Sequence, residues 1–157
     1  MQKMNQYLIN NEVLYSKLKE SFKKLTLSNS VIIYGEKGIG KSTFVKNFIE
    51  QLFVNFKNID NNNLSKHTIL LKNNTHPNFR LITNQIDEKT KKLRNNIIVN
   101  QIRDLILFIY QSSINDLPKI IVIDCADDLN TSASNALLKI LEEPKQNTYF
   151  FLITHQL

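Results

Sequence analysis

The residues with the clearest chemical potential form a short glycine-containing segment between positions 34 and 43. The segment fits the pattern G-x-x-x-x-G-K-[ST] and holds all three glycines of the chain. Glycine has no Cβ, so such a loop can adopt positive φ angles and turn its backbone N–H groups inward around an anion. The predicted nucleotide-binding residues are Gly35, Glu36, Lys37, Gly38, Ile39, Gly40, Lys41, Ser42 and Thr43.

The residues on either side of this loop predict a strand and a helix. Residues 31–34 form a β-branched and aromatic run, which is typical of a buried strand. A chance match in a turn would lack such flanks. We therefore expect ATP and Mg²⁺ here, with Lys41 at the β- and γ-phosphates, Ser42 on the metal and the helix dipole favouring the anion. Apolar residues recur at helical spacing after the loop: Phe44, Val45, Phe48, Ile49 and Leu52.

A second candidate site follows an apolar run late in the chain. Residues 120–123 are typical of a buried strand, and Asp124 closes it. Beside a phosphate loop, a strand-end carboxylate orients Mg²⁺; alternatively, Asp124 caps the next turn. The next residue is Cys125, and a neutral thiol is a poor general base. Asp127 is either a turn or cap residue or a weak candidate for that base.

Apolar periodicity predicts the remaining elements. Strands that alternate with helices indicate an α/β fold, a three-layer sandwich with a mainly parallel central sheet. Ligands of such sheets bind beyond the carboxyl ends of the strands, where the glycine loop, Asp124 and Thr154 all lie. Residues 56–63 are expected to be a loop and Asn10 or Asn11 a helix cap. We expect helices at 11–25, 41–55, 98–113 and 131–141, and strands at 31–34, 67–71 (a strand or an edge), 79–83 (a central strand), 120–123 and 149–154.

One basic segment, residues 87–96, has two possible roles. It carries Lys89, Lys91, Lys92 and Arg94, so it could face nucleic acid, or it could be a solvated connection.

Composition limits the class of protein. The 157 residues suit one domain, 1–157, and 42% hydrophobic content with 9% aromatics indicates a globular chain. No apolar run approaches the roughly 20 residues of a membrane span, so we expect a cytoplasmic protein. The single cysteine excludes an internal disulfide and an all-cysteine zinc site. A net charge of +6 suits an anionic partner.

The later part of the chain resembles the AAA+ clamp-loader subunits of bacterial DNA polymerase III. The resemblance is carried by K-I-I-V-I-D-C-A-D at 119–127, N-A-L-L-K-I-L-E-E-P at 135–144 and F-F-L-I-T at 150–154. Upstream, H-P-N at 76–78 and V-N-Q-I-R at 99–103 are similar to the delta-prime group of these subunits. The resemblance covers nearly the whole chain.

The resemblance implies a P-loop NTPase fold of AAA+ type and a role in DNA replication. Such subunits help to load the sliding clamp onto primed DNA within the polymerase holoenzyme, a nucleotidyltransferase assembly. The implied partners are the gamma/tau and delta subunits, and through them the clamp and DNA, with no membrane. Thr154 takes the sensor 1 position near the γ-phosphate, and the helix before Pro144 belongs to a face that packs on a neighbouring subunit.

Three departures from the family pattern shape the expectations. Members often carry a four-cysteine zinc module, but residues 56–75 hold no cysteine, so we expect no zinc and solvated or capping roles for His67 and His76. The lid, the Ser-Arg-Cys segment with its arginine finger and the collar domain are expected to be absent. Cys125 replaces the usual catalytic Glu, so we expect weak ATPase activity.

The alternative function is a stand-alone P-loop kinase or another ATPase. A kinase of this kind needs an arginine-bearing lid over the transferred phosphoryl group. The chain has three arginines, which are Arg80, Arg94 and Arg103, and no arginine-rich lid.

Overall fold

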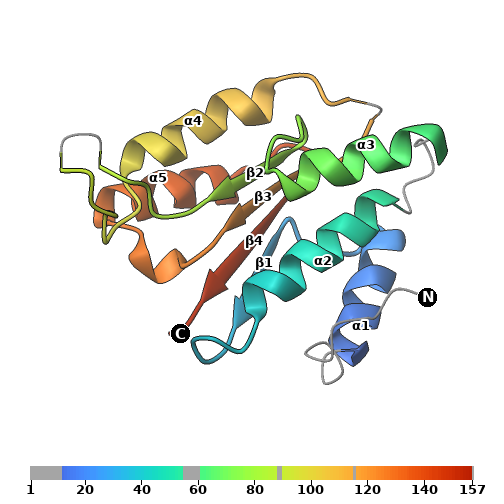
Figure 1. Cartoon of the computed structure of the whole chain (residues 1–157), viewed down its shortest axis with the longest axis horizontal. Helices are drawn as coiled ribbons and strands as arrows, with labels where there is room; N and C mark the ends of the chain where they lie inside the picture. Colours follow the sequence, from blue (N-terminus) through green and yellow to red (C-terminus); the bar gives the residue numbers. More distant parts are fainter. Residues whose placement is uncertain (1–11, 55–60, 88–89, 115, 157) are drawn as a thin grey trace.

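The computed structural model describes residues 12–54, 61–87, 90–114 and 116–156 in three layers (Figure 1). The middle layer is a sheet with the strand order β1-β4-β3-β2, and every neighbouring pair is parallel. This arrangement confirms the predicted α/β class. The strands are β1 (Ser30–Tyr34), β2 (Phe79–Ile82), β3 (Lys119–Ile123) and β4 (Thr148–Thr154).

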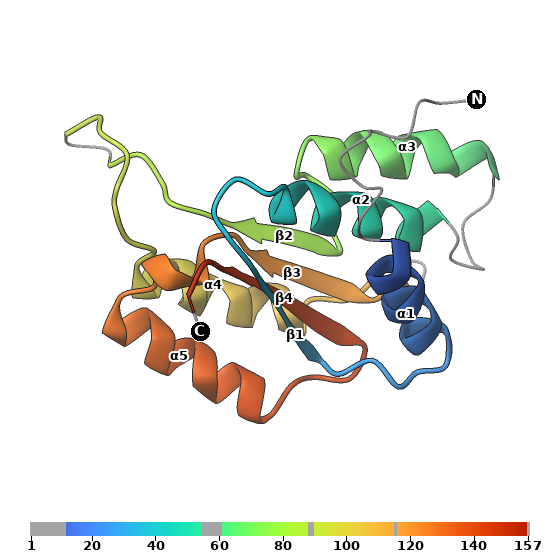
Figure 2. The ribbon, with the colours of Figure 1, turned by 90° about the horizontal axis from the view of Figure 1, so that it is seen from below.

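Helices cover both faces of the sheet (Figure 2). One face packs against α1 (Glu12–Lys23), α2 (Lys41–Val54) and α3 (Asn61–Lys72). The other face packs against α4 (Val99–Tyr110) and α5 (Thr131–Glu142). The sheet therefore separates two apolar cores, and its strand ends lie between the helical layers.

The central strand β3 shows why the sequence forms this sheet. Side chains alternate between the two faces of a strand, and here both faces are covered. Ile120 and Val122 join the core under α1, α2 and α3, whereas Ile121 and Ile123 join the core under α4 and α5. A strand buried on both sides must be apolar at consecutive positions, which explains the uninterrupted run in the sequence.

The predicted strand at 67–71 is wrong, because these residues belong to α3. A short apolar run has no periodicity that separates a strand from a buried helical turn. Ile69 and Leu71 would share one face of a strand, but Leu71 is 8% exposed and Ile69 is 58% exposed, as a helix requires. Residues 61–63 of the predicted loop also lie in α3, while 56–60 lie outside the described residues.

The strand at 79–83 is confirmed as β2, but it lies at the edge of the sheet and not in its centre. The helix predicted at 11–25 is α1, and its proposed caps at positions 10 and 11 lie outside the described residues. Within the described ranges, none of the helices has both the length and the apolarity that a bilayer crossing requires.

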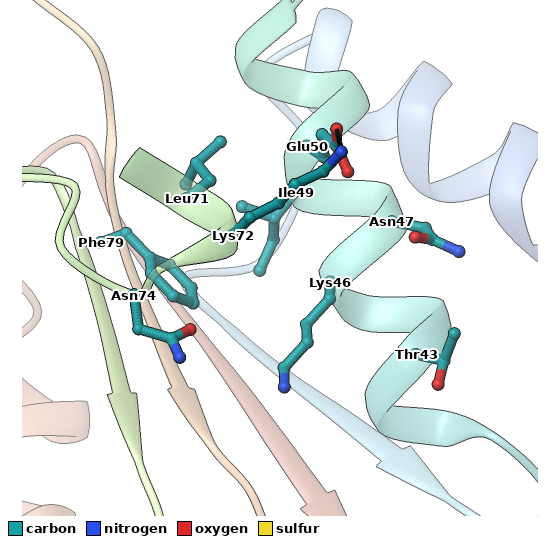
Figure 3. A pocket seen from close by; sticks show the side chains of 9 residues that line it. All are labelled: Thr43, Lys46, Asn47, Ile49, Glu50, Leu71, Lys72, Asn74 and Phe79. Atoms are coloured by element: carbon teal, nitrogen blue, oxygen red, sulfur yellow. Dashed lines mark ion pairs between the residues drawn. The ribbon is translucent and has the colours of Figure 1, made fainter. Parts of the chain in front are cut away.

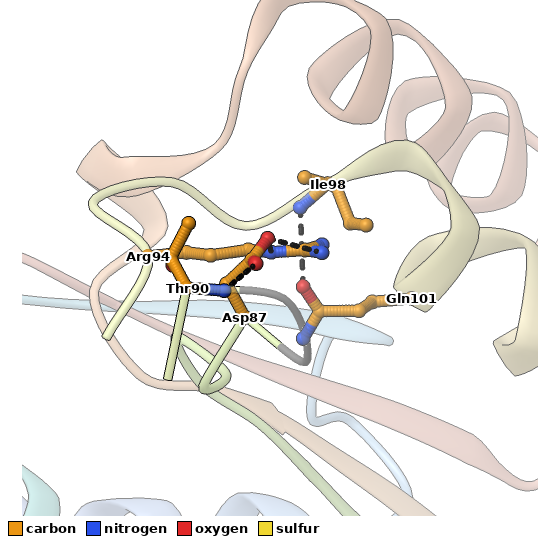
Figure 4. A network of polar contacts seen from close by, with 5 residues as sticks. All are labelled: Asp87, Thr90, Arg94, Ile98 and Gln101. Carbon is orange, nitrogen blue, oxygen red and sulfur yellow. Dashed lines mark hydrogen bonds and ion pairs between the residues drawn. The ribbon is translucent and has the colours of Figure 1, made fainter. Parts of the chain in front are cut away.

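Side-chain hydrogen bonds define where the later helices begin. The Asn130 side chain accepts a 2.8 Å hydrogen bond from the Ala133 N–H and thereby caps α5. At α4, Gln101 Oε1 accepts from the Ile98 N–H at 3.1 Å (Figure 4), and its Nε2 donates to Thr83 O at 2.9 Å. Gln101 thus ties the start of α4 to the end of β2. The helix ends at Tyr110, before the predicted position 113.

The basic segment after β2 folds back on itself through an antiparallel bridge, and Lys89 lies outside the described residues. Ile86 and Leu93 form an isolated bridge, and both are exposed. Inside the turn, Asp87 accepts from the Thr90 N–H and from the Arg94 guanidinium, with a 2.9 Å ion pair to Arg94 (Figure 4). The Arg94 charge is therefore neutralised within the segment.

Candidate nucleotide-binding site

Strand register places the predicted site residues together at the carboxyl ends of the strands. Tyr34 of β1 lies opposite Thr154 of β4, and Ile123 of β3 lies opposite Leu152. The glycine loop begins directly after Tyr34, and Asp124 directly after Ile123. Because the strands are parallel, these carboxyl ends meet at the same edge, so the structure brings together the loop, Asp124 and Thr154.

The glycine loop has a backbone that few other residues adopt. Gly38 and Gly40 have φ angles of 88° and 91°, in the left-handed region that side chains disfavour. Helix α2 begins at the next residue, Lys41, so its free N–H groups lie at the end of the loop. A glycine loop that leads into a helix N-terminus fits a phosphate group.

The Lys41 side chain lies within the loop and is only 7% exposed. Its Nζ donates to the carbonyl oxygens of Gly35 and Glu36 at 2.6 and 2.7 Å. It also lies 2.8 Å from His155 Nδ1. A cation in this position carries a positive charge to the place where the predicted phosphates would lie.

Ser42 and Asp124 form the oxygen pair of the site. The Ser42 hydroxyl donates a 2.9 Å hydrogen bond to Asp124 Oδ2. A hydroxyl and a carboxylate are hard oxygen ligands of the kind that Mg²⁺ prefers, together with phosphate oxygens. The donor set at the end of the loop therefore fits ATP with Mg²⁺.

Cys125 follows Asp124 in a left-handed conformation, with a φ angle of 64°. Burial raises the pKa of its thiol, and the nearby carboxylates of Asp124 and Asp128 raise it further. A thiol with a raised pKa stays protonated near neutral pH. Cys125 therefore cannot replace a carboxylate as a general base.

Asp127 fastens the end of β4 to the turn after β3. Its carboxylate accepts from the Thr154 hydroxyl at 2.5 Å and from the His155 N–H at 2.7 Å. Burial raises the Asp127 pKa, but these hydrogen bonds outweigh burial and leave the pKa below its usual range. Both carboxylate oxygens are engaged, which favours the turn or cap role over the catalytic one.

His155 is the residue that sequence reasoning missed. Its ring lies between Lys41 Nζ and Cys125 Sγ, with Nε2 3.7 Å from the sulfur. The only signal in the sequence is its place directly after Thr154. Its contact with Lys41 joins residues 114 positions apart, so only the folded chain reveals it.

The predicted solvated role of His67 and His76 is wrong, because both side chains are buried. His67 Nδ1 lies 2.8 Å from His76 Nε2, and His76 packs edge-on against Phe53 at 4.7 Å between ring centroids. The predicted capping role holds for His76, whose Nδ1 accepts from the Asn78 N–H at 3.0 Å. Burial lowers the His76 pKa to about 4, with a further contribution from His67.

A separate surface pocket lies between α2 and α3 (Figure 3). Its lining includes Thr43, Lys46 and Phe79, and the Lys72–Glu50 ion pair of 3.7 Å crosses it. Phe79 is the first residue of β2, so the pocket extends toward the amino ends of the strands. Asp124 and Thr154 are not among its lining residues, and it shares Thr43 with the predicted nucleotide-binding loop.

The parallel sheet between two helical layers, with its glycine loop between β1 and α2, defines an α/β protein of AAA+ type. The family described as "DNA polymerase III, delta subunit" matches residues 10–157. The chain belongs to this family.

Individual relatives agree with this assignment. The DNA polymerase III subunit delta' of Pseudomonas aeruginosa is 32% identical over 130 residues, which cover 82% of this chain and 38% of that protein. The protein of the same name from Buchnera aphidicola subsp. Baizongia pistaciae is 30% identical over 151 residues, covering 90% of this chain and 45% of that protein. The chain thus spans less than half the length of these relatives, and the resemblance to delta-prime subunits is confirmed.

A solved structure supports the fold. The crystal structure of a DNA polymerase III, gamma subunit-related protein from Thermotoga maritima matches with a TM-score of 0.55 and 18% identity, covering 90% of this chain and 39% of that chain. At this identity the match shows the fold alone.

Proposed function

We propose that this chain is the AAA+ ATP-binding domain of a clamp-loader delta-prime subunit. In this role it binds ATP with Mg²⁺ and helps to load the sliding clamp onto primed DNA in the cytoplasm. The observation that supports ATP binding most strongly is the Ser42–Asp124 hydrogen bond at the end of the glycine loop. It brings a phosphate loop and a strand-end carboxylate, distant in sequence, into one oxygen-lined position.

The residues of the site have separate roles in this proposal. The loop N–H groups and the N-terminus of α2 bind the phosphates, and Lys41 neutralises the β- and γ-phosphates. Ser42 would hold Mg²⁺, and Asp124 would orient it through its water shell. Thr154, at the end of β4, would lie near the γ-phosphate, and its hydroxyl would have to leave Asp127 to contact that phosphate. Bound Mg²⁺ would neutralise phosphate charge.

Hydrolysis by the isolated chain should be weak. The Cys125 thiol stays protonated, and Asp127 is engaged with Thr154 and His155. Arginine is also missing from the strand-end site among the described residues. Arg94 pairs with Asp87 within its own segment, and Arg80 stacks on the Phe108 ring at 4.8 Å. Arg103 lies on α4, in a pocket between α4 and α5. ATP therefore acts as a structural ligand that orders the loop and the end of β4.

The proposed partners are the gamma/tau and delta subunits of the clamp loader. Family membership supports this role, and exposed apolar side chains on α4 and α5 offer surfaces for a neighbouring subunit. Leu107 and Tyr110 on α4 and Leu138 on α5 are exposed.

A thermal shift titration tests ATP binding. A ligand that binds only the folded state stabilises it, and ATP with Mg²⁺ at 100 times Kd should raise Tm by about 5–10 °C for a chain of this size. Lys41→Ala and Ser42→Ala should lose most of this shift. Lys46→Ala, on the same helix but outside the loop, should keep it. A wild-type chain without any shift at millimolar ATP would refute the proposal.

A further inference from the structure

The Lys41 ammonium is fully satisfied by groups of the chain itself. A lysine ammonium has three N–H donors, and three acceptors lie within 2.8 Å of Nζ. Two of them are the carbonyl oxygens of Gly35 and Glu36, which belong to the loop. The third is the imidazole of His155, which belongs to the chain beyond β4. A phosphate oxygen that binds the ammonium must therefore replace one of these three acceptors.

The contacts of His155 determine its tautomer. Lysine can only donate, so Nδ1 accepts from Lys41 and the ring proton lies on Nε2. Nε2 lies 3.7 Å from Cys125 Sγ, where the N–H has a weak sulfur acceptor. His155 thus joins the phosphate-loop lysine to the residue that follows Asp124.

His155 is also held in place by its backbone. Its N–H donates to Asp127, which accepts the Thr154 hydroxyl as well. The backbone of His155 therefore has a fixed position next to the loop. By contrast, the Gly35 and Glu36 carbonyls are part of the loop that must surround the phosphates. Of the three acceptors, the half-buried His155 ring is the one that can exchange Lys41 for water at the least cost.

We propose that His155 is a positioning residue that competes with phosphate for the Lys41 ammonium and thereby sets the affinity for ATP. When a phosphate takes the ammonium, His155 loses its partner, so occupation of the loop is communicated to the Cys125 turn and to the end of β4. This inference rests on the proposed ATP site and adds to it a residue outside the phosphate loop.

The test measures Kd for ATP by calorimetry with the 157-residue chain and its variants. His155→Ala removes the competing acceptor and should tighten ATP binding about three- to tenfold. This factor corresponds to the net contribution of one hydrogen bond, which the nucleotide-free state loses in the variant. His155→Asn places an amide oxygen near the Nδ1 position and should restore the wild-type Kd. Gln156→Ala, at the exposed neighbouring side chain, should leave Kd unchanged.

Two further measurements separate competition from a general structural effect. AMP lacks the phosphates that Lys41 contacts, so its Kd should be the same in the wild type and in His155→Ala. Long-range ¹H–¹⁵N spectra of the protein without nucleotide should show the His155 proton on Nε2. ATP should then shift the Nδ1 resonance as Lys41 leaves.

Each outcome decides a separate question. If the wild type binds ATP and His155→Ala binds it with the same or weaker affinity, the competition is overturned but the ATP site stands. The same conclusion follows if His155→Asn tightens binding as much as His155→Ala does. A His155 proton on Nδ1 would also overturn it. Binding of ATP to neither the wild type nor His155→Ala would overturn the ATP site and this inference together.

Discussion

Ser42 and Asp124 are 82 residues apart in sequence, yet the Ser42 hydroxyl donates a 2.9 Å hydrogen bond to the Asp124 carboxylate. This contact connects the first helical turn after the glycine loop to the carboxyl end of β3. In the proposed function, the same two side chains would hold Mg²⁺.

Asp124→Asn tests this metal role. The variant keeps the size of the side chain and removes its charge, so ATP binding in Mg²⁺ should weaken by about tenfold, as for other partners that orient metal-bound water. Binding of ATP in EDTA should change little, because Lys41 and the loop remain. Asp104→Asn, at an exposed carboxylate of α4, is the matched control. Equal losses with and without Mg²⁺ would contradict the metal role.

Cys125→Glu tests the origin of weak turnover. General-base assistance is worth roughly 10²–10⁴-fold, and an arginine finger in related phosphoryl transfers roughly 10³–10⁵-fold. The variant should therefore raise ATP hydrolysis measurably when a neighbouring subunit supplies arginine, and little when the chain is alone. Residue 125 already has a Cβ in its left-handed conformation. Replacing Cys125 by Glu therefore does not add the backbone strain that replacing a glycine would cause.

A phosphate release assay on the wild type can contradict this prediction. Turnover by the isolated chain at about 1 s⁻¹ or faster, in the range of ordinary enzymes, would show that a base is present. Loss of that activity in Asp127→Asn would identify Asp127 as the base.

The buried His67–His76 pair should make stability depend on pH. The His76 pKa is about 4 in the folded chain against 6.5 for an unperturbed histidine, so between these values the unfolded state binds more protons. The contribution of His76 to the free energy of unfolding is therefore fully present above pH 6.5 and is lost as the pH falls toward 4. From pH 7.5 to 5.5 the free energy of unfolding should drop by about 1.4 kcal/mol.

Urea denaturation at several pH values measures this effect. His76→Asn keeps an acceptor for the Asn78 N–H but cannot titrate, so its stability should vary less over the same range. A wild type and a variant with the same pH dependence would show that the pair contributes nothing to it.

Asn78 should be a major source of stability outside the site. Its side chain is fully buried, donates to Ile114 O and Leu117 O at 3.1 and 3.0 Å, and accepts from the Ile114 N–H at 3.1 Å. Asn78→Ala leaves these backbone groups without their partner and should cost about 2–4 kcal/mol. Asn135→Ala, on the exposed side of α5, should cost less than about 0.5 kcal/mol. A chemical denaturation curve for each variant measures the difference, and similar losses would refute this role.

The sequence by itself determined the elements with strong local signals. Consecutive apolar residues at 120–123 require a strand with two covered faces, and Asn130 caps its helix through a local hydrogen bond. The glycine loop is equally local, because Gly38 and Gly40 supply the left-handed backbone that the motif needs. Periodicity could not distinguish a strand from a helix at 67–71, because a run of five mostly apolar residues fits a strand as well as one turn of α3.

Tertiary structure alone decided which side chains meet at the strand ends. Strand order put β2 at the edge and β4 beside β1, so that Thr154 lies level with Tyr34 and His155 reaches Lys41. No local pattern encodes that contact, because it depends on the register between strands that are more than a hundred residues apart. The same holds for the His67–His76 pair: each histidine is polar when taken alone, and only the folded chain packs His76 against Phe53 and places His67 beside it.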